Sequence, residues 1–271
     1  MDTTGGGFYD DPAIYDILHA DGTGAEVAGL EAMCRRFVPG WRPGRGRWLE
    51  PACGTARYLR GAARRGVDCV GIDLHAATVE YARRHARSIR SARGGRAGRC
   101  RVEIGDMTDM TRVVESGSIA FAFCLINTIR HLPDGRAIGA HLREMARVLR
   151  PGGAYAVGLS MTAYGFEGPT EDHWYGRRGG TVVRQVVQYI PPGDAANPEP
   201  RSELVVSHLT ITRRGRTEHR DAAYRLRTYS LSQWLGVIAR SPLRTLAVVD
   251  EQGDDAFAHE PGYAIFVLGK R

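Results

Sequence analysis

The chain has 271 residues, 43% of them hydrophobic, and a formal net charge of +7. This composition excludes a disordered protein and is sufficient for one domain with a buried core and an inserted elaboration. Because no run approaches the roughly 18 apolar residues of a membrane span, and the acidic, glycine-rich N-terminus lacks the pattern of a secretion signal, we expect a cytoplasmic protein with no membrane partner.

Strands alternate with helices through the first 160 residues. Two short helical patterns, 8–20 and 25–38, come first and should lie over the strands and helices after them. The next elements are strand 46–51, helix 56–66, strand 67–74, helix 76–89, strand 101–107, strand 118–127, helix 135–149 and strand 152–160. The strands are mostly apolar on both faces, which is typical of a parallel sheet covered by helices.

The pattern changes after Ser160. A polar, aromatic segment, 161–180, leads into three strand-like runs, which predict an antiparallel insertion. These runs are 181–190, 203–213 and 217–230, and they are followed by helix 231–240 and by a closing antiparallel pair, 243–251 and 262–271.

The predicted fold class is therefore α/β. We expect a Rossmann-like, doubly wound, mostly parallel sheet with an antiparallel last strand and an antiparallel cap inserted after strand five. The expected divisions are N-terminal helices over the ligand site (1–44), the core (45–160), the cap or substrate insertion (161–229), and a C-terminal helix with closing strands (230–271).

Acidic residues stand at the carboxyl ends of the first predicted strands, where doubly wound sheets bind ligands. Strand 46–51 reaches Glu50 near its end, and the chain then turns through the small residues 52–56, so that bare backbone can approach a ligand. Asp73 ends the next strand, 19 residues after Gly54, close to the spacing at which an acid binds ribose hydroxyls.

The next two strand ends suit the base of the same ligand. Asp106 can accept a hydrogen bond from an adenine amino group, and Met107 can lie against the ring. Asn127 and Thr128 follow the fourth strand at the same edge. The four strand ends together predict one nucleoside-like ligand.

The stretches LEPACGTARYLR, VGIDL, IGDM, CLINTIRHL and REMARVLRPGGAYAVGL occur in this order over roughly residues 45–160. In order and spacing they resemble the successive motifs of class I S-adenosylmethionine-dependent methyltransferases. The resemblance implies an enzyme with S-adenosyl-L-methionine as cofactor and S-adenosyl-L-homocysteine as product. The turn fits a nucleoside better than a nucleotide, because no GK[ST] follows it to hold phosphates and it has one of the three glycines of the dinucleotide fingerprint.

The resemblance also implies the cofactor-binding residues, position by position. Glu50 to Ala56 would lie beneath the methionine part, Asp73 would bind the ribose, and Tyr15, ahead of Tyr9, would close over the methyl group. The full implied set is Tyr9, Tyr15, Glu50, Ala52, Cys53, Gly54, Asp73, Leu74, Asp106, Met107, Leu125 and Asn127. The chain departs from the family at Ala52 and Ala56, where glycines are usual, and at Ala120, which supplies no carboxylate.

Methyl transfer mainly requires alignment of the nucleophile with the methyl group and surroundings that suit a sulfonium, such as aromatic faces. Tyr15 and His131 are the candidate catalytic residues. The candidate substrate-binding residues are Trp174, Tyr175, Arg184 and Tyr229.

Each of these candidates has a structural alternative. His131 could be a hydrogen-bonded structural histidine, and the aromatic residues could simply pack. Arg184, like Arg225 and Arg227, alternates with apolar residues and fits a solvent-facing strand position.

We therefore predict a methyltransferase that transfers a methyl group to N or O of a small molecule by direct in-line displacement. An RNA or protein methyltransferase is one alternative, because arginines cluster at 83–101. That cluster falls at a predicted helix end without interleaved aromatic residues, so a nucleic-acid partner is not expected. A catalytically inactive, cofactor-binding partner subunit is the second alternative.

The sequence predicts little about metals or assembly. The five cysteines are scattered, and no cluster of histidines and carboxylates has ligand spacing, so no metal is expected. A homodimer is compatible with the sequence, which does not name the methyl acceptor.

Overall fold

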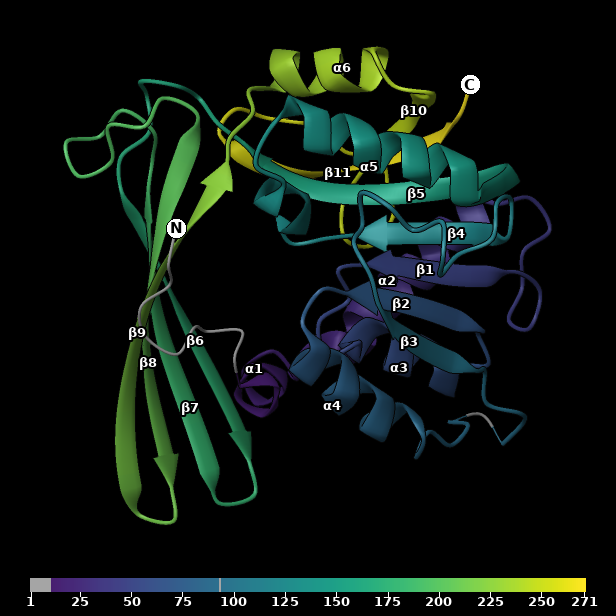
Figure 1. Ribbon diagram of the computed structural model, residues 1–271, viewed down its shortest axis with the longest axis horizontal. Helices are drawn as coiled ribbons and strands as arrows, with labels where there is room; N and C mark the ends of the chain where they lie inside the picture. The colour runs from purple at the N-terminus through teal and green to yellow at the C-terminus, as the bar shows by residue number, and fades with distance from the viewer. Residues whose placement is uncertain (1–10, 93) are drawn as a thin grey trace.

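The computed structural model describes residues 11–92 and 94–271. A seven-stranded sheet with the order β10-β11-β5-β4-β1-β2-β3 forms the core, and a four-stranded sheet with the order β6-β7-β8-β9 forms the cap. The cap sheet stands beside the core, and its strands run across the direction of the core strands (Figure 1).

The core strands from β5 to β3 are parallel, whereas β11 runs antiparallel to both β5 and β10. The predicted fold class is therefore confirmed. The strands of this sheet are β1 (Arg47–Pro51), β2 (Cys69–Asp73), β3 (Cys100–Ile104), β4 (Ile119–Cys124), β5 (Leu149–Met161), β10 (Leu243–Val249) and β11 (Gly262–Lys270).

Helices cover both faces of this sheet, which explains why its strands are apolar throughout. Buried residues of α5 and α6 pack on one face, and buried residues of α2, α3 and α4 pack on the other. The helices are α1 (Pro12–Leu18), α2 (Thr23–Phe37), α3 (Arg57–Arg64), α4 (Ala76–Ala86), the 3-10 helix η1 (Thr128–His131), α5 (Gly135–Val148) and α6 (Leu231–Ala239).

The chain order reverses beside β1. From β1 the chain continues outward to β2 and β3, and then returns to β4 on the other side of β1. The loops that leave β1 and β4 therefore diverge and leave room between them at the carboxyl edge of the sheet, which is where ligands bind in this architecture.

The cap contains one strand more than the sequence predicts. The strands are β6 (Thr170–Arg178), β7 (Thr181–Ile190), β8 (Ser202–Arg213) and β9 (Arg216–Arg227). The prediction of three strands was wrong at β6. Every residue of β6 except Gly176 is exposed, so its sequence shows no alternation of apolar and polar residues. Pairing with β7 defines this strand.

The N-terminal helix α1 lies between the cap and the core (Figure 1). Its apolar residues Ile14, Ile17 and Leu18 pack on the cap sheet, in a cluster with Val183, Leu209 and Ile211. It also contacts α4. The helix thus closes the space between the two sheets on one side.

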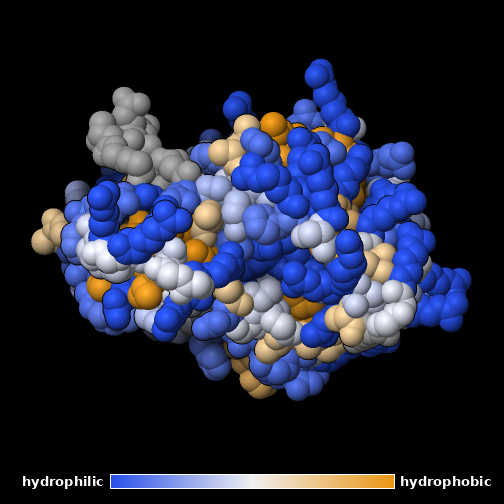
Figure 2. Space-filling model, turned by 90° about the horizontal axis from the view of Figure 1, so that it is seen from below, coloured by the Kyte–Doolittle hydropathy of each residue, from blue (hydrophilic) through white to orange (hydrophobic). Residues whose placement is uncertain are grey.

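Two surface observations limit other interpretations of the chain. In the described part of the chain, no helix is both long and apolar enough to cross a membrane. On the face of the molecule shown in Figure 2, hydrophobic residues form small areas separated by hydrophilic ones.

Candidate active site

The loop between β1 and α3 presents its backbone to open space. Ala52, Gly54 and Ala56 all have φ between +52° and +56°, a left-handed conformation that favours glycine. The loop is anchored by the Cys53 N–H, which donates to the Ile72 carbonyl at 2.8 Å. A Cβ on Gly54 would have no neighbour within 4 Å, so a ligand can approach the backbone there.

Two carboxylates flank this loop. Asp73 accepts hydrogen bonds from the backbone N–H groups of Gly54 at 2.8 Å and of His75 at 2.9 Å, through different oxygens. Glu50 is 8% exposed, and its Oε2 has no hydrogen-bond partner among the described residues. Burial raises the pKa of Glu50 well above 4.5, although the nearby Arg57 acts in the opposite direction. A buried oxygen without a partner beside an open loop fits a site that receives a donor from a ligand.

Tyr15 of α1 belongs to the same region. Its phenol interacts electrostatically with Glu50, Asp73, Arg57 and Tyr224. Burial raises the pKa of Tyr15 to about 12, so the ring is neutral at pH 7. Tyr9, the other predicted tyrosine, lies outside the described residues.

Arg57, which the sequence reasoning did not single out, brings a charged group to the same region. Its guanidinium is ion-paired with Glu26 of α2 and also bonds Tyr58 and Thr23. Its side chain is only 10% exposed. It therefore places a fixed positive charge near Glu50 and Tyr15. Its position directly after the turn 52–56 could have identified it as a residue close to the ligand site.

Exposed apolar side chains stand at the carboxyl edge of β2, β3 and β4, on both sides of β1. Leu74 after β2 is 65% exposed, Ile104 at the end of β3 is 52% exposed, and Ile126 after β4 is 51% exposed. A single exposed aliphatic residue is ordinary, but three at one edge of the sheet give that edge apolar surface. They are suited to the faces of a planar base.

The predicted base-binding residues have mixed surroundings. Asp106 is exposed, and its Oδ1 accepts from the backbone N–H of Thr108 at 2.7 Å and from its hydroxyl at 2.8 Å. Met107 is buried, and its carbonyl lies 3.0 Å from Nδ1 of His141. Leu125 is half-buried and packs against the core. Asp106 thus already caps a turn.

The side-chain amide of Asn127 is hydrogen-bonded to the end of β5. Its Oδ1 accepts from the Ser160 N–H at 2.7 Å, and its Nδ2 donates to the Ser160 hydroxyl at 3.1 Å. The amide therefore joins the ends of β4 and β5. The backbone of Asn127 has a φ of +62°, which is a left-handed conformation.

His131 of η1 reaches the cap. It is exposed, and its ring stacks on Tyr224 of β9 with ring centroids 5.6 Å apart. Neighbouring protein atoms, which partly shield the ring from water, and the adjacent Arg130 lower the pKa of His131 below 6.5. The imidazole is neutral at pH 7.

The cap turns one face toward α1 and η1, and strand alternation decides which predicted substrate residues lie on it. Trp174 pairs with Gln185, and Tyr175 pairs with Arg184, so the two sets point to opposite faces. Trp174 lies on the inner face, where its ring is 5.4 Å from that of His19. Tyr175 and Arg184, the other two candidate substrate-binding residues of these strands, lie on the opposite face, where the Arg184 guanidinium is 5.6 Å from the centre of the Tyr175 ring.

Tyr229 and His19 also lie in different places. Tyr229 is 2% exposed and packs on Trp234 inside the core, so it does not line an open site. His19, which the sequence reasoning missed, lies between Tyr15 and Trp174 and is 4.5 Å from the Tyr15 ring. Its spacing of four residues from Tyr15 places both on one helix face and could have identified it.

Comparison with known proteins shows which family model and which solved structures this chain is similar to. Residues 49–153 match the family model described as a methyltransferase domain. They span β1 to the first part of β5 and therefore include the loop, Glu50 and Asp73. This match agrees with the resemblance of the sequence motifs to class I S-adenosylmethionine-dependent methyltransferases.

Solved structures match the chain far beyond the methyltransferase domain. The sugar N-methyltransferase KedS8 from Streptoalloteichus sp ATCC 53650 has a TM-score of 0.72 at 19% identity, covering 100% of this chain and 95% of that chain. DesVI from Streptomyces venezuelae has a TM-score of 0.71 at 17% identity, covering 96% and 98%.

A third match is CalS10, an amino pentose methyltransferase from Micromonospora echinaspora in a SAM-bound structure. Its TM-score is 0.64 at 18% identity, covering 92% of this chain and 90% of that chain. At these identities the likeness is one of fold, and it includes the cap beside the methyltransferase domain. No curated protein matches the chain as a sequence relative.

Proposed function

We propose that this chain transfers a methyl group from S-adenosyl-L-methionine to an amine nitrogen of a small molecule, with an amino sugar as the favoured acceptor class. The observation that carries the proposal is the open turn at Gly54, flanked by Glu50 and Asp73 and faced by Tyr15. The acceptor class is supported by the fold shared with the sugar N-methyltransferase KedS8 over the whole chain, cap included.

The residues of this edge fit the cofactor. Asp73 has lone pairs left after its two backbone contacts and would accept from the ribose hydroxyls. Glu50 would accept from the amino group of the methionine part, and Arg57 would attract its carboxylate. Leu74 and Ile126 would contact the adenine faces.

When bound, the cofactor supplies an electrophilic methyl group on a sulfonium, which a nucleophile displaces in line. The neutral ring of Tyr15 would provide an electron-rich surface beside that positive charge. Trp174 and His19 on one side, and His131 with Tyr224 on the other, would line the acceptor. Aromatic faces suit the C–H surface of a sugar ring.

The state of His131 favours nitrogen over oxygen as the acceptor atom. Because its pKa is lowered from 6.5, His131 is a weaker base toward an alcohol proton than an ordinary histidine. An amine can lose its ammonium proton to water before it reacts, and the neutral imidazole would then only need to accept a hydrogen bond from it.

The alternatives have less support. In the basic segment 83–101, Arg83 is ion-paired with Glu103 and Arg84 with Glu80, and Arg101 donates to the Val113 carbonyl at 2.6 Å. These contacts occupy three of the arginines of the segment with protein groups, as expected for a solvated helix end. An inactive partner subunit would have no need of an aromatic lining opposite the cofactor site.

The first test is isothermal titration with S-adenosyl-L-methionine and S-adenosyl-L-homocysteine, with NADH as the control. Binding of the first two alone supports the cofactor, whereas no binding overturns the proposal. Amino sugars and their hydroxyl analogues are then compared as acceptors with methyl-labelled cofactor. Label found only in the hydroxyl analogues would contradict the assignment to nitrogen.

A further inference from the structure

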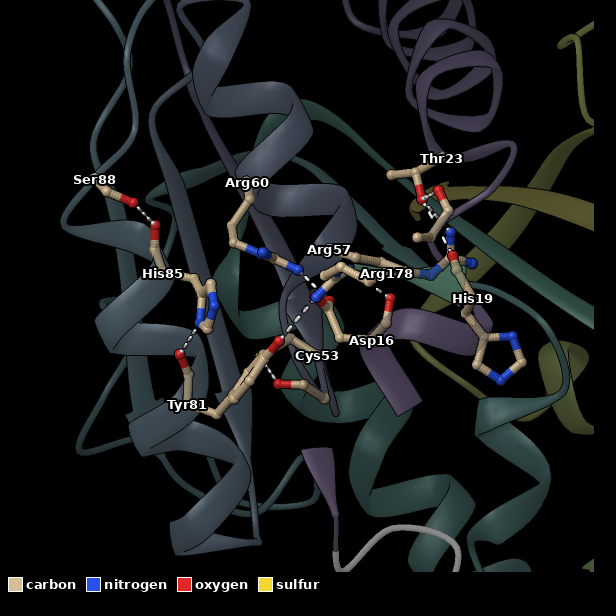
Figure 3. A network of polar contacts seen from close by, with 12 residues as sticks. Asp16, His19, Thr23, Cys53, Arg57, Arg60, Tyr81, His85, Ser88 and Arg178 are labelled. Carbon is tan, nitrogen blue, oxygen red and sulfur yellow. Dashed lines mark hydrogen bonds and ion pairs between the residues drawn. The ribbon is translucent and has the colours of Figure 1, made fainter. Parts of the chain in front are cut away.

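Asp16, next to Tyr15 on α1, is a buried carboxylate held from three directions. Its side chain is 3% exposed. Arg60 of α3 forms an ion pair with it, Tyr81 of α4 donates its hydroxyl at 3.0 Å, and Arg178 of β6 donates at 3.0 Å. Figure 3 shows these three side chains converging on Asp16. One carboxylate thus joins α1 to two core helices and to the cap.

The attachment of α1 to the cap does not depend on Asp16 alone. The apolar cluster of Ile14, Ile17 and Leu18 with the cap sheet supports it. The helix backbone also comes so close to the cap that a Cβ on Gly176 would lie 2.4 Å from the Ile17 carbonyl oxygen. Asp11 adds ion pairs to Arg213 and Arg220 of the cap. On the cap side, therefore, α1 has many supports.

On the core side, the contacts of Asp16 are polar and few. Arg60 and Tyr81 reach it from α3 and α4, the helices that flank the end of β2. Burial by itself would raise the pKa of Asp16, but Arg60, Tyr81 and Arg178 together lower it below 3.8, so the carboxylate is ionised at pH 7. An ionised carboxylate is stable in this place only while these partners remain.

We propose that Asp16 is a positioning residue whose contacts with Arg60 and Tyr81 hold α1, and with it Tyr15, over the cofactor site. The inference rests on the proposed function and adds a residue to it. Because α1 is packed firmly on the cap, loss of the core-side contacts would let α1 and the cap move away together. Arg178 also donates to the Tyr81 hydroxyl at 3.4 Å, but its loss would leave α1 attached to the cap through the apolar cluster and to the core through Arg60 and Tyr81.

The test compares Tyr81→Phe and Arg60→Gln with the matched cap-side variant Arg178→Gln. The dissociation rate constant of S-adenosyl-L-homocysteine is measured by stopped-flow displacement, and its Kd by titration. We expect both core-side variants to accelerate dissociation by about tenfold or more, the factor that corresponds to one lost hydrogen bond to a charged group. Arg178→Gln should change it by less than about twofold.

Thermal unfolding of the same variants separates positioning from stability. A merely structural role would make the dissociation rate follow the loss of Tm in all three variants. Equal rates in the three variants, or unchanged rates in both core-side variants, would overturn the inference. Failure of the wild-type chain to bind S-adenosyl-L-homocysteine would instead overturn the proposed function, so the two failures are distinguishable.

Discussion

The carboxylate of Asp73 accepts the backbone N–H of Gly54 at 2.8 Å and thereby ties the end of β2 to the loop after β1. The two residues are 19 positions apart in the sequence. This hydrogen bond nevertheless makes the position of the loop depend on the Asp73 carboxylate. A change at Asp73 should therefore affect both ligand binding and loop geometry.

Replacement of Asp73 separates these two effects. Asp73→Ala removes both the proposed ribose acceptor and the partner of Gly54, and should weaken cofactor binding by about 100-fold or more. Asp73→Asn keeps an oxygen for Gly54 and should lose less. Titration with S-adenosyl-L-methionine measures both. An unchanged Kd in Asp73→Ala would show that the ribose is bound elsewhere.

Glu50 should make the free energy of unfolding depend on pH. Because its folded pKa lies well above 4.5, the folded state keeps a proton that the unfolded state loses above pH 4.5, so stability falls as pH rises through that window. Glu50→Gln should remove this fall and be more stable than wild type at pH 8, by about 1 kcal/mol. It should also bind the cofactor more weakly. Denaturant unfolding at pH 5 and pH 8 checks the first effect, and a parallel pH response in both proteins would contradict it.

Trp174 and Tyr175 provide a matched pair on opposite faces of one strand. Trp174→Ala removes an inner-face ring and should raise the acceptor KM about tenfold, with a smaller effect on kcat. Tyr175→Ala, on the outer face, should leave both constants within about twofold. Steady-state kinetics with the best acceptor measures both variants. The reverse order would mean that the outer face carries the acceptor.

Arg130 connects η1, the short helix after β4, to the cap. It is 2% exposed, and it donates to the Arg227 carbonyl and to Glu203, both at 2.9 Å. Arg130→Met leaves Glu203 without this partner and should lower the free energy of unfolding by about 3 kcal/mol. Arg184→Met, at an exposed cap position, should cost less than about 0.5 kcal/mol. Urea unfolding compares the two, and similar losses would argue against a structural role of the pair.

Ala56 should tolerate glycine unusually well. It is the residue before α3 and has φ of +56°, a conformation that costs an alanine about 1 kcal/mol or more. Relief of this cost should offset the added backbone entropy of glycine, so Ala56→Gly should be neutral or slightly stabilising. Ala62→Gly, inside the same helix, should destabilise by about 1 kcal/mol. The two free energies of unfolding decide the point.

Much of the fold was accessible from the sequence because parallel strands are buried on both faces and show as short apolar runs between helical patterns. The acids at strand ends followed from the same pattern, since Glu50 and Asp73 stand where those runs stop. The methyltransferase motifs are likewise continuous stretches of chain. These features depend on neighbours in sequence, and so the sequence by itself determined them.

The tertiary structure decided which side chains share a space. The amide of Asn127 is bound by Ser160, 33 residues later, and Asp16 binds Arg178, which is 162 residues away. Alternation along β6 separates Trp174 from Tyr175 but does not say which of them faces α1. That choice depends on the packing of Ile14, Ile17 and Leu18 against the cap. Contacts between distant segments are set by packing across the whole fold, which no local pattern of residues records.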